Sequence, residues 1–448
     1  MSIEPLKLIL ILGGTLFLGT LGVIAARGFS QRAMLVGLLI GLVFYSGIGA
    51  ADLEVPFIYV MYFFIFFMAV IIGFHLGRVV FMPLSNGIGR KVPEALDSMS
   101  RGIFWQVVIA AYVLLFLIPL VWPEFRLYDL LRPPKPDLRY VFSRRFEEPD
   151  AVLRLIGYFK LILTPFFYLA LYRWRFNLGK ISVLLVSLMY IEYVSNAYIG
   201  RGQILINLGL LILGIWVLRP KYRRRVIVAG IILMPFLFYA SYWYSCIRIG
   251  GTVGGISIGK AITSVLTSEL SFPLKVGMPI IEAGARVNFK DYLVWIITLP
   301  LPKLLTGPIE GARINYEISE LILGLPIGSP GWYVVLPGIV AESFYIFGPE
   351  LFWLHGLFLG IMAAFFARVT ERVPQFLFLY SYIVIQFSYV LNRGGIASLL
   401  PTIINEFLLF YLYLFAIVFY HRRKMYSLNI TIKQNACQKN TVNDIYLA

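Results

Sequence analysis

Long apolar segments separated by shorter polar ones occupy most of the chain. A helix that crosses the hydrocarbon core of a bilayer needs about 20 apolar residues. The apolar runs are continuous, which excludes a transmembrane β-barrel, because barrel strands alternate apolar and polar residues. The pattern predicts an all-α polytopic membrane protein with about 11 transmembrane helices, at 8–26, 33–48, 56–77, 103–121, 152–171, 181–198, 203–218, 226–242, 351–367, 375–391 and 400–420.

Composition supports this class. Of the 448 residues, 59% are apolar or aromatic and only 14% are charged, and the mean hydropathy is +0.81. A soluble domain is about a quarter charged, so a water-soluble enzyme is excluded. The first apolar run, 8–26, is longer than the core of a usual signal peptide and Arg27 follows it at once, so we interpret it as a retained first span.

Basic residues mark alternate connections between the predicted spans. Cytoplasmic loops collect Lys and Arg, which predicts an outward-facing N-terminus and accounts for the net charge of +16 without a nucleic-acid partner. The basic residues of these connections are Arg27 and Arg32, then Arg78, Arg90, Lys91 and Arg101, then Arg173, Arg175 and Lys180, and finally the run Arg219–Arg225.

One further apolar segment, Trp332–Gly348, leaves two possibilities open. If it crossed the membrane, the basic residues after it would lie outside, whereas a segment that dips in and returns, or lies along the outer face, keeps them inside. Pro337, Gly338, Gly348 and Pro349 interrupt it, and broken backbone at membrane depth is tolerated only against protein or a wet cavity. We therefore predict eleven spans with the C-terminus inside.

This topology divides the chain into four parts. Residues 1–242 contain helices 1–8 with an outer loop at 122–151, and residues 243–350 form a large periplasmic loop with interfacial and re-entrant segments. Residues 351–420 contain the last three spans, and 421–448 form a cytoplasmic tail. Two distant cysteines, three scattered histidines and the lack of metal or nucleotide motifs predict no metal and no cofactor.

Three arginines on the predicted outer side are candidates for anion binding. Arg201 and Arg393 lie in short glycine-containing turns between spans, where the positive-inside bias disfavours arginine, and Arg313 lies in the large loop. Neighbouring glycines let backbone N–H groups approach an anion, and a guanidinium grips phosphate bidentately. The alternative is that each arginine reaches a lipid headgroup or caps a helix. For Lys303, Arg248 and Arg286 we favour that alternative.

Among the acidic residues, Glu342 is the best placed, because it lies in the interrupted segment near the outer side. A carboxylate there can act as general base toward a sugar hydroxyl or pair with one of the arginines. His355, near the outer end of the ninth predicted span, is expected to be a packed histidine. The other acidic candidates are Glu317 and Glu320 in the large loop, with Glu192 and Glu406 expected to be satisfied inside the bundle.

Several of these segments, taken in order, resemble the bacterial O-antigen or oligosaccharide repeat-unit polymerases (Wzy-type membrane proteins). The matching pieces are Ile199-Gly-Arg201-Gly, Leu299-Pro-Leu-Pro-Lys-Leu, Ser329-Pro-Gly331, Gly338-Ile-Val-Ala-Glu342-Ser-Phe-Tyr345-Ile-Phe-Gly348 and Asn392-Arg393-Gly394. The large outer loop before the last three spans is similar as well.

The resemblance implies a glycosyltransferase of the bacterial inner membrane whose active site faces the periplasm or cell exterior. It would move a growing glycan from its polyprenyl diphosphate carrier to the non-reducing end of a new lipid-linked repeat unit, for O-antigen or another surface polysaccharide. Arg201, Arg313 and Arg393 would hold the diphosphates of donor and acceptor and stabilise the charge as the leaving group departs, and Glu342 would act as base or sugar ligand. The implied partners are polyprenyl-diphosphate-linked oligosaccharides, membrane lipids, a chain-length-determining co-polymerase and a flippase.

Two alternatives remain open at this point. A transporter or flippase of lipid-linked saccharide predicts internal repeats and charges on both sides of the membrane midplane, whereas the arginines here gather on one predicted face and no repeat is found. An O-antigen-ligase-like glycosyltransferase differs only in the acceptor, and a catalytic His355 would favour it.

Overall fold

The computed structural model describes residues 3–98, 165–174, 219–248, 272–299, 314–327, 334–405 and 410–420, with isolated positions besides these. The described part is helical and contains no strand. Six of its helical segments are long and apolar enough to cross a membrane, which confirms the helical membrane-protein class. These segments are Pro5–Ala25, Phe29–Ala50, Ile58–Val80, Gly338–Arg372, Pro374–Gly394 and Ile396–Tyr420.

The six segments coincide with six of the predicted spans, while the count of eleven stays a prediction. The spans predicted at 103–121 and 181–198 lie outside the described residues, those at 152–171 and 203–218 are described only in part, and the one at 226–242 lies within a helix. The loop at 122–151 lies outside the described residues as well, and of the tail only one position is described.

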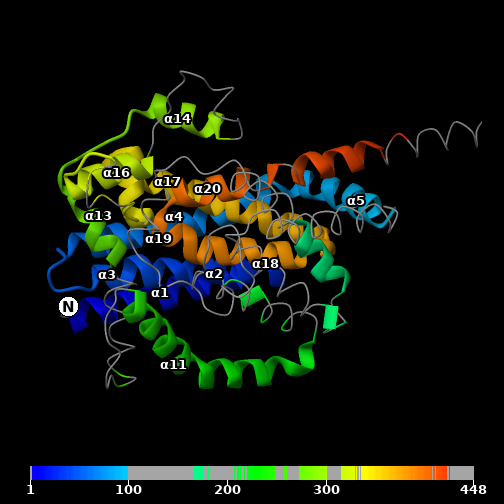
Figure 1. Ribbon diagram of the computed structural model, residues 1–448, viewed down its shortest axis with the longest axis horizontal. Coiled ribbons are helices and arrows are strands. Elements are labelled where there is room, and N and C mark those ends of the chain that lie inside the picture. The colour runs from blue at the N-terminus through cyan, green and yellow to red at the C-terminus, as the bar shows by residue number, and fades with distance from the viewer. Residues whose placement is uncertain are drawn as a thin grey trace, which may run out of the picture.

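The elements of the bundle lie side by side with their axes along one direction (Figure 1). The first spans consist of α1 (Pro5–Ala25), α2 (Phe29–Leu42) continued by the π-helical turn η1 (Val43–Gly47) and α3 (Ile48–Ala50), and α4 (Ile58–Val80). The last spans consist of α17 (Gly338–Arg372), then η5 (Pro374–Phe376), α18 (Leu377–Ile385), the π-helical turn η6 (Gln386–Leu391) and α19 (Asn392–Gly394), then α20 (Ile396–Asn405).

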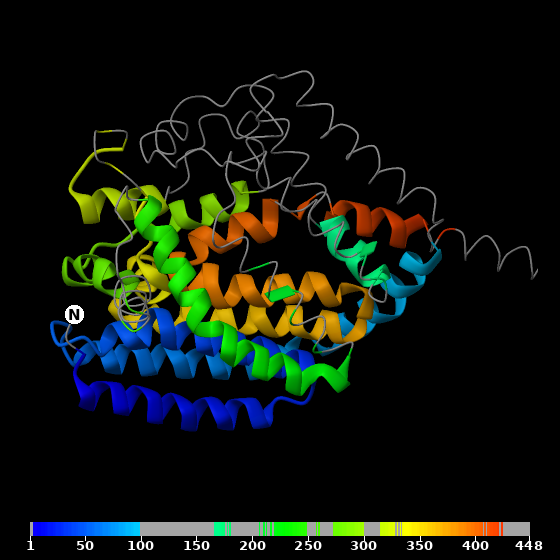
Figure 2. The same cartoon turned by 60° about the horizontal axis from the view of Figure 1, so that its bottom comes forward.

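Shorter or more peripheral helices complete the described part. Figure 2 shows α1 on the edge of the bundle and α11 crossing its flank. The large loop predicted at 243–350 contributes three helices that pack near one end of the bundle. The peripheral elements are α5 (Met82–Ser98), η3 (Pro220–Tyr222), α11 (Arg223–Arg248), α13 (Phe272–Glu282), α14 (Phe289–Thr298) and α16 (Ile314–Leu323).

Among the described helices, α4 and α17 pack closely against each other along their length. A Cβ atom added to Gly73 would lie 2.0 Å from the Leu357 carbonyl oxygen, and one added to Gly360 would lie 2.2 Å from the Val70 carbonyl oxygen. Glycine lets two backbones approach this closely, a common device where membrane helices pack. Because Tyr62 contacts Phe352 at one end and Arg78 contacts Arg368 at the other, the two helices run in the same direction.

We expect Gly73→Ala to destabilise the protein by about 1–3 kcal/mol, as overpacking of a close-packed interior does. The obstacle is the backbone of α17, which cannot rotate away as a side chain can. Gly13→Ala on α1 is the matched control, because nothing lies within 4 Å of a Cβ added there. Thermal unfolding in detergent should show a lower midpoint for Gly73→Ala alone, and equal midpoints for the two variants would contradict the predicted contact.

The interrupted segment Trp332–Gly348 ends in a sharp reversal of the chain. Gly348 has φ 72° and ψ 173°, a left-handed conformation that favours glycine. Phe344 stacks on Phe352 at 4.4 Å between ring centroids, although eight residues of unbroken helix would separate them by about 12 Å along the axis. The helical residues 338–347 therefore fold back on the long helix that follows. At about 15 Å they are too short to cross the hydrocarbon core alone.

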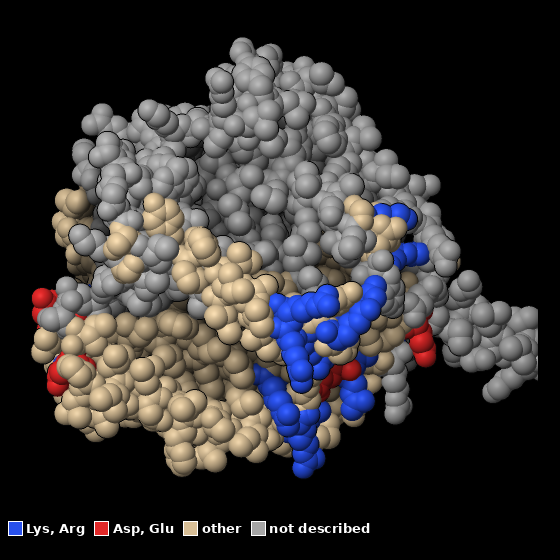
Figure 3. Space-filling view, turned by 90° about the horizontal axis from the view of Figure 1, so that it is seen from below, with Lys and Arg blue, Asp and Glu red and all other residues tan. Residues whose placement is uncertain are grey.

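Charge is distributed unevenly along the bundle. On the face in Figure 3, Lys and Arg side chains gather at one end of a broad band without charged residues. Contacts bring the connections of three spans together at this basic end: Arg78 donates to the Ala25 carbonyl at 2.7 Å, and Arg368 to the Arg78 carbonyl at 3.1 Å. The opposite end, which we call the Arg393 end, holds Lys7 and Asp52, whose carbonyl accepts from the Lys7 ammonium at 3.2 Å, and the turn α19 that contains Arg393 lies toward this end of the bundle (Figure 1).

Candidate functional site

Arg393 lies in the short turn α19, between the π-helical turn η6 and helix α20. Its side chain is half-buried. The guanidinium Nη1 donates to the Tyr389 hydroxyl at 2.8 Å and the guanidinium carbon lies 5.8 Å from the centroid of the same ring, within the range of a cation–π contact. The Arg393 guanidinium is therefore held beside the ring and hydroxyl of Tyr389.

The residue before Arg393 anchors this turn to the bundle. Asn392 is fully buried, and its amide nitrogen donates to the Phe387 carbonyl at 2.7 Å, the Ser388 carbonyl at 3.2 Å and the Leu38 carbonyl at 3.5 Å. Phe387 and Ser388 belong to η6, whose π-helical geometry displaces carbonyls from the usual α-helical bonds. Asn392 thus provides hydrogen-bond donors to carbonyls of the widened turn and links this turn to α2.

Glu342 holds the other side of the same turn. Its carboxylate accepts from the backbone N–H of Ile396 at 2.6 Å and of Ala397 at 2.8 Å, the first residues of α20. These N–H groups have no partner within their own helix, and a carboxylate complements the positive end of the helix dipole. Gly395 has φ 75°, and a Cβ there would lie 2.1 Å from the Glu342 carboxylate, so the approach requires glycine.

The structure therefore brings two predicted site residues, Arg393 and Glu342, to the same turn. Glu342 is 0% exposed, and both of its oxygens accept bonds from α20. The predicted pairing with an arginine is not its contact in the described part of the chain. This geometry favours a role in positioning the Arg393 turn over direct proton transfer to a sugar.

A second π-helical turn contributes to the surroundings of Arg393. Tyr45, from η1, meets the ring of Tyr389 edge to face, with centroids 6.0 Å apart. A Cβ added to Gly41 would lie 2.1 Å from the Ser388 carbonyl oxygen, so glycine lets α2 approach η6 here. Single π-helical turns inside helices are frequent at functional sites.

The remaining candidates are placed as follows. Arg201, Arg313, Lys303, Glu192 and Glu406 lie outside the described residues, as does the side chain of Arg248. Arg286 is exposed and pairs with Glu350 at 3.0 Å. Glu317 accepts from the Tyr345 hydroxyl at 2.9 Å, and Glu320 accepts from the Ile327 N–H at 2.7 Å.

His355 is buried beneath the reversal at Gly348. Its Nδ1 lies 2.7 Å from the Ser343 hydroxyl oxygen, and that hydroxyl donates to the Ile339 carbonyl at 2.6 Å. With the serine proton engaged there, His355 Nδ1 carries the proton of the shared bond. The pair joins the short helical segment to the long one, in agreement with the packed histidine expected from the sequence.

A buried ion pair fastens the large loop to the bundle at the Arg393 end. Lys275 of α13 contacts Asp52 at 2.7 Å and Glu54 at 2.8 Å. Burial by itself would raise the pKa of Asp52, but the bonds from Lys275 and the Glu54 backbone outweigh it and lower that pKa below its ordinary value. The same two carboxylates raise the pKa of Lys275. Both groups are therefore charged at neutral pH.

Asp52→Asn is expected to cost about 1–2 kcal/mol at pH 7, the value of a hydrogen-bonded ion pair with one partly exposed partner. A carboxylate with a lowered pKa stabilises the fold above its ordinary pKa of about 3.9 and loses that contribution as the pH falls through the folded-state value. The difference in unfolding midpoint between wild type and Asp52→Asn should therefore shrink as the pH is lowered from 7 to 3. Glu54→Gln, at the exposed carboxylate, is the control with a smaller effect, and a pH-independent difference would contradict the ion pair.

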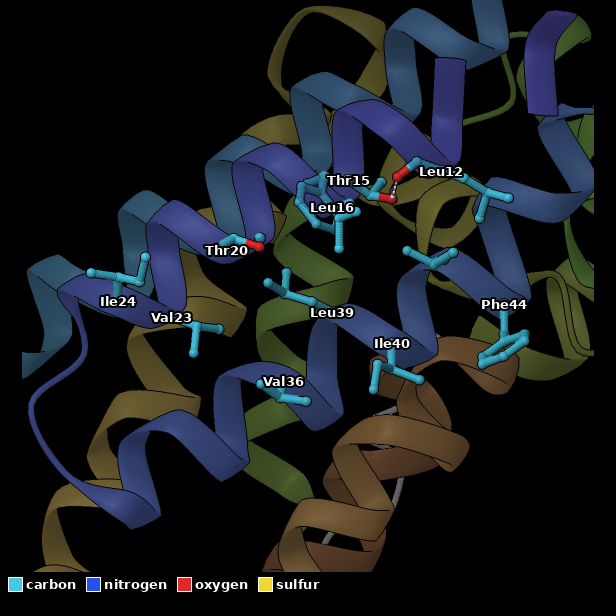
Figure 4. Close-up of a pocket in the computed structure, with 13 residues that line it drawn as sticks. Leu12, Thr15, Leu16, Thr20, Val23, Ile24, Val36, Leu39, Ile40 and Phe44 are labelled. Carbon is cyan, nitrogen blue, oxygen red and sulfur yellow. Dashed lines mark hydrogen bonds between the residues drawn. The ribbon is translucent and has the colours of Figure 1, made fainter. Parts of the chain in front are cut away.

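An apolar groove of about 530 Å³ runs between α1 and α2 (Figure 4). Its lining residues carry no ionisable side chain, and the Thr15 hydroxyl is engaged by the Ile11 carbonyl at 2.6 Å. The groove suits a hydrocarbon chain, and its lining provides no group for catalysis or ion binding. Within the described ranges, no cluster of three or more His, Cys, Asp or Glu side chains forms a metal site.

Comparison of the chain with known protein families, curated proteins and solved structures found no match. The functional argument therefore depends on the Arg393 turn itself. Of its parts, Tyr389 was missed from the sequence, and Asn392 was noted only as a member of the Asn392-Arg393-Gly394 segment, without a role. Tyr389 stands four residues before Arg393, the spacing at which helical side chains meet, and that signal could have found it. Nothing in the local sequence relates Lys275 to Asp52.

Proposed function

We propose that the protein polymerises polyprenyl-diphosphate-linked oligosaccharide repeat units at the outer face of a bacterial inner membrane. The observation that carries the proposal is the half-buried Arg393, which is bonded to Tyr389 and lies toward the end of the bundle opposite the basic end (Figure 1). Arginine, with its planar fork of donors, is the residue type best suited to grip a diphosphate. The basic end agrees with a cytoplasmic side, so Arg393 would face the periplasm or cell exterior.

In the proposed reaction the bond between the anomeric carbon of the donor glycan and its diphosphate oxygen breaks. Polyprenyl diphosphate leaves with the electron pair, the hydroxyl oxygen at the non-reducing end of the acceptor unit bonds to the anomeric carbon, and its proton passes to a base. Arg393, together with Arg201 and Arg313, would hold the diphosphates and neutralise the charge that develops on the leaving group. We assign Glu342 the positioning of Arg393, because two backbone N–H groups already engage its oxygens.

Reconstitution tests this function. Purified protein in liposomes receives polyprenyl-diphosphate-linked repeat units, with EDTA present and nucleotide sugars absent, and the products are separated on a gel. A ladder of glycans is the expected result. Movement of the lipid-linked saccharide between leaflets without a ladder would reject the polymerase and favour a transporter. A single transfer to a lipid or protein acceptor would favour a ligase.

A further inference from the structure

The two π-helical turns place a tyrosine pair beside Arg393. Tyr389 stands on η6 and Tyr45 on η1, and their rings meet edge to face. The Asn392 amide donates to two carbonyls of η6, those of Phe387 and Ser388, and to the Leu38 carbonyl of α2. Hydrogen bonds from the turn that carries Arg393 therefore stabilise the π-helical geometry of η6. This geometry sets the direction in which the Tyr389 side chain projects.

The Tyr389 hydroxyl has a defined hydrogen-bonding role in this arrangement. Its oxygen accepts a hydrogen bond from Arg393 Nη1 at 2.8 Å. A phenol that accepts from a guanidinium keeps its own O–H to donate, and the neighbouring positive charge makes that proton a stronger donor. Both side chains are half-buried, which leaves part of each open to a ligand.

We propose that Tyr389 is a second ligand of the anion that Arg393 binds, donating its hydroxyl proton to a phosphate oxygen while orienting the guanidinium. The inference rests on the proposed function for the chemical class of the anion, a prenyl diphosphate. Tyr45 acts as a positioning residue, because its ring supports that of Tyr389 edge to face.

Binding of farnesyl diphosphate to the full-length protein in zwitterionic nanodiscs tests this role. Tyr389→Phe keeps the ring and removes one hydroxyl, and we expect it to weaken binding by about 10-fold to 100-fold, the range for a lost hydrogen bond to a charged group. Tyr411→Phe is the matched control, because it also loses one hydroxyl and one bond, to the Ile403 carbonyl at 3.0 Å. Its binding should equal that of wild type.

A double-mutant cycle separates ligation from a general effect on the fold. In an Arg393→Ala background, Tyr389→Phe should still weaken the residual binding, but several-fold less than in wild type, because the charge of Arg393 no longer strengthens the Tyr389 donor and the two groups act on one ligand. Additive losses would overturn the proposal, and so would wild-type binding by Tyr389→Phe. Displacement of farnesyl diphosphate by phosphatidylglycerol as efficient as by unlabelled farnesyl diphosphate would overturn it as well. Polymer ladders from wild type together with unchanged binding by Tyr389→Phe would overturn this inference alone. Wild-type binding without ladders would reject only the proposed function.

Discussion

Replacement of Arg393 by alanine is expected to reduce polymer formation by about 10²–10³-fold, the cost of removing one donor that stabilises developing negative charge. The protein should still fold, because the side chain is half-buried and its described partners, the ring and hydroxyl of Tyr389, lie one helical turn away. Rates of ladder growth in liposomes, measured beside thermal unfolding midpoints, check this result.

Two further variants make the Arg393 result specific. Arg393→Lys retains the charge but not the planar fork, so we expect it to recover only part of the activity. Arg372→Ala removes an exposed arginine at the basic end and should leave the ladder unchanged. Full activity in Arg393→Ala, or an equal loss in Arg372→Ala, would rule out a diphosphate site at this turn.

Glu342 should give the largest effect on stability. Glu342→Leu leaves two buried N–H donors of α20 without their acceptor, at about 1–3 kcal/mol each. The expected sum, about 2–6 kcal/mol, is comparable to the stability of many domains. The protein should show a strongly lowered unfolding midpoint and lose activity together with the geometry of the Arg393 turn.

Glu342→Gln distinguishes positioning from proton transfer. Glutamine keeps one acceptor oxygen and turns an NH₂ group toward the second N–H, so a positioning role predicts an intermediate loss of stability with a parallel loss of activity. A general base would instead give a stable protein with activity reduced by about 10²-fold or more. Unfolding midpoint and ladder rate, measured on the same preparations, decide between these roles.

The class of protein and the position of several spans could be predicted from the residue types along the chain. Apolar length is a local sum over about 20 residues, so the six helical segments coincide with predicted ones. Gly348 and Pro349 marked the break in the interrupted segment, and glycines marked the turn of Arg393. These features depend on backbone conformation within a few residues, which the residue types constrain directly.

The partners of the polar side chains depend on contacts between distant parts of the chain and could not be predicted from the sequence. Glu342 caps a helix that begins 54 residues later, and Lys275 pairs with Asp52 across more than two hundred residues of sequence. Asn392 braces a π-helical turn that no residue pattern announces. The partner of a buried polar group depends on which backbone atoms the packed helices bring within about 3 Å. Hydropathy and spacing along the chain contain no information on that distance.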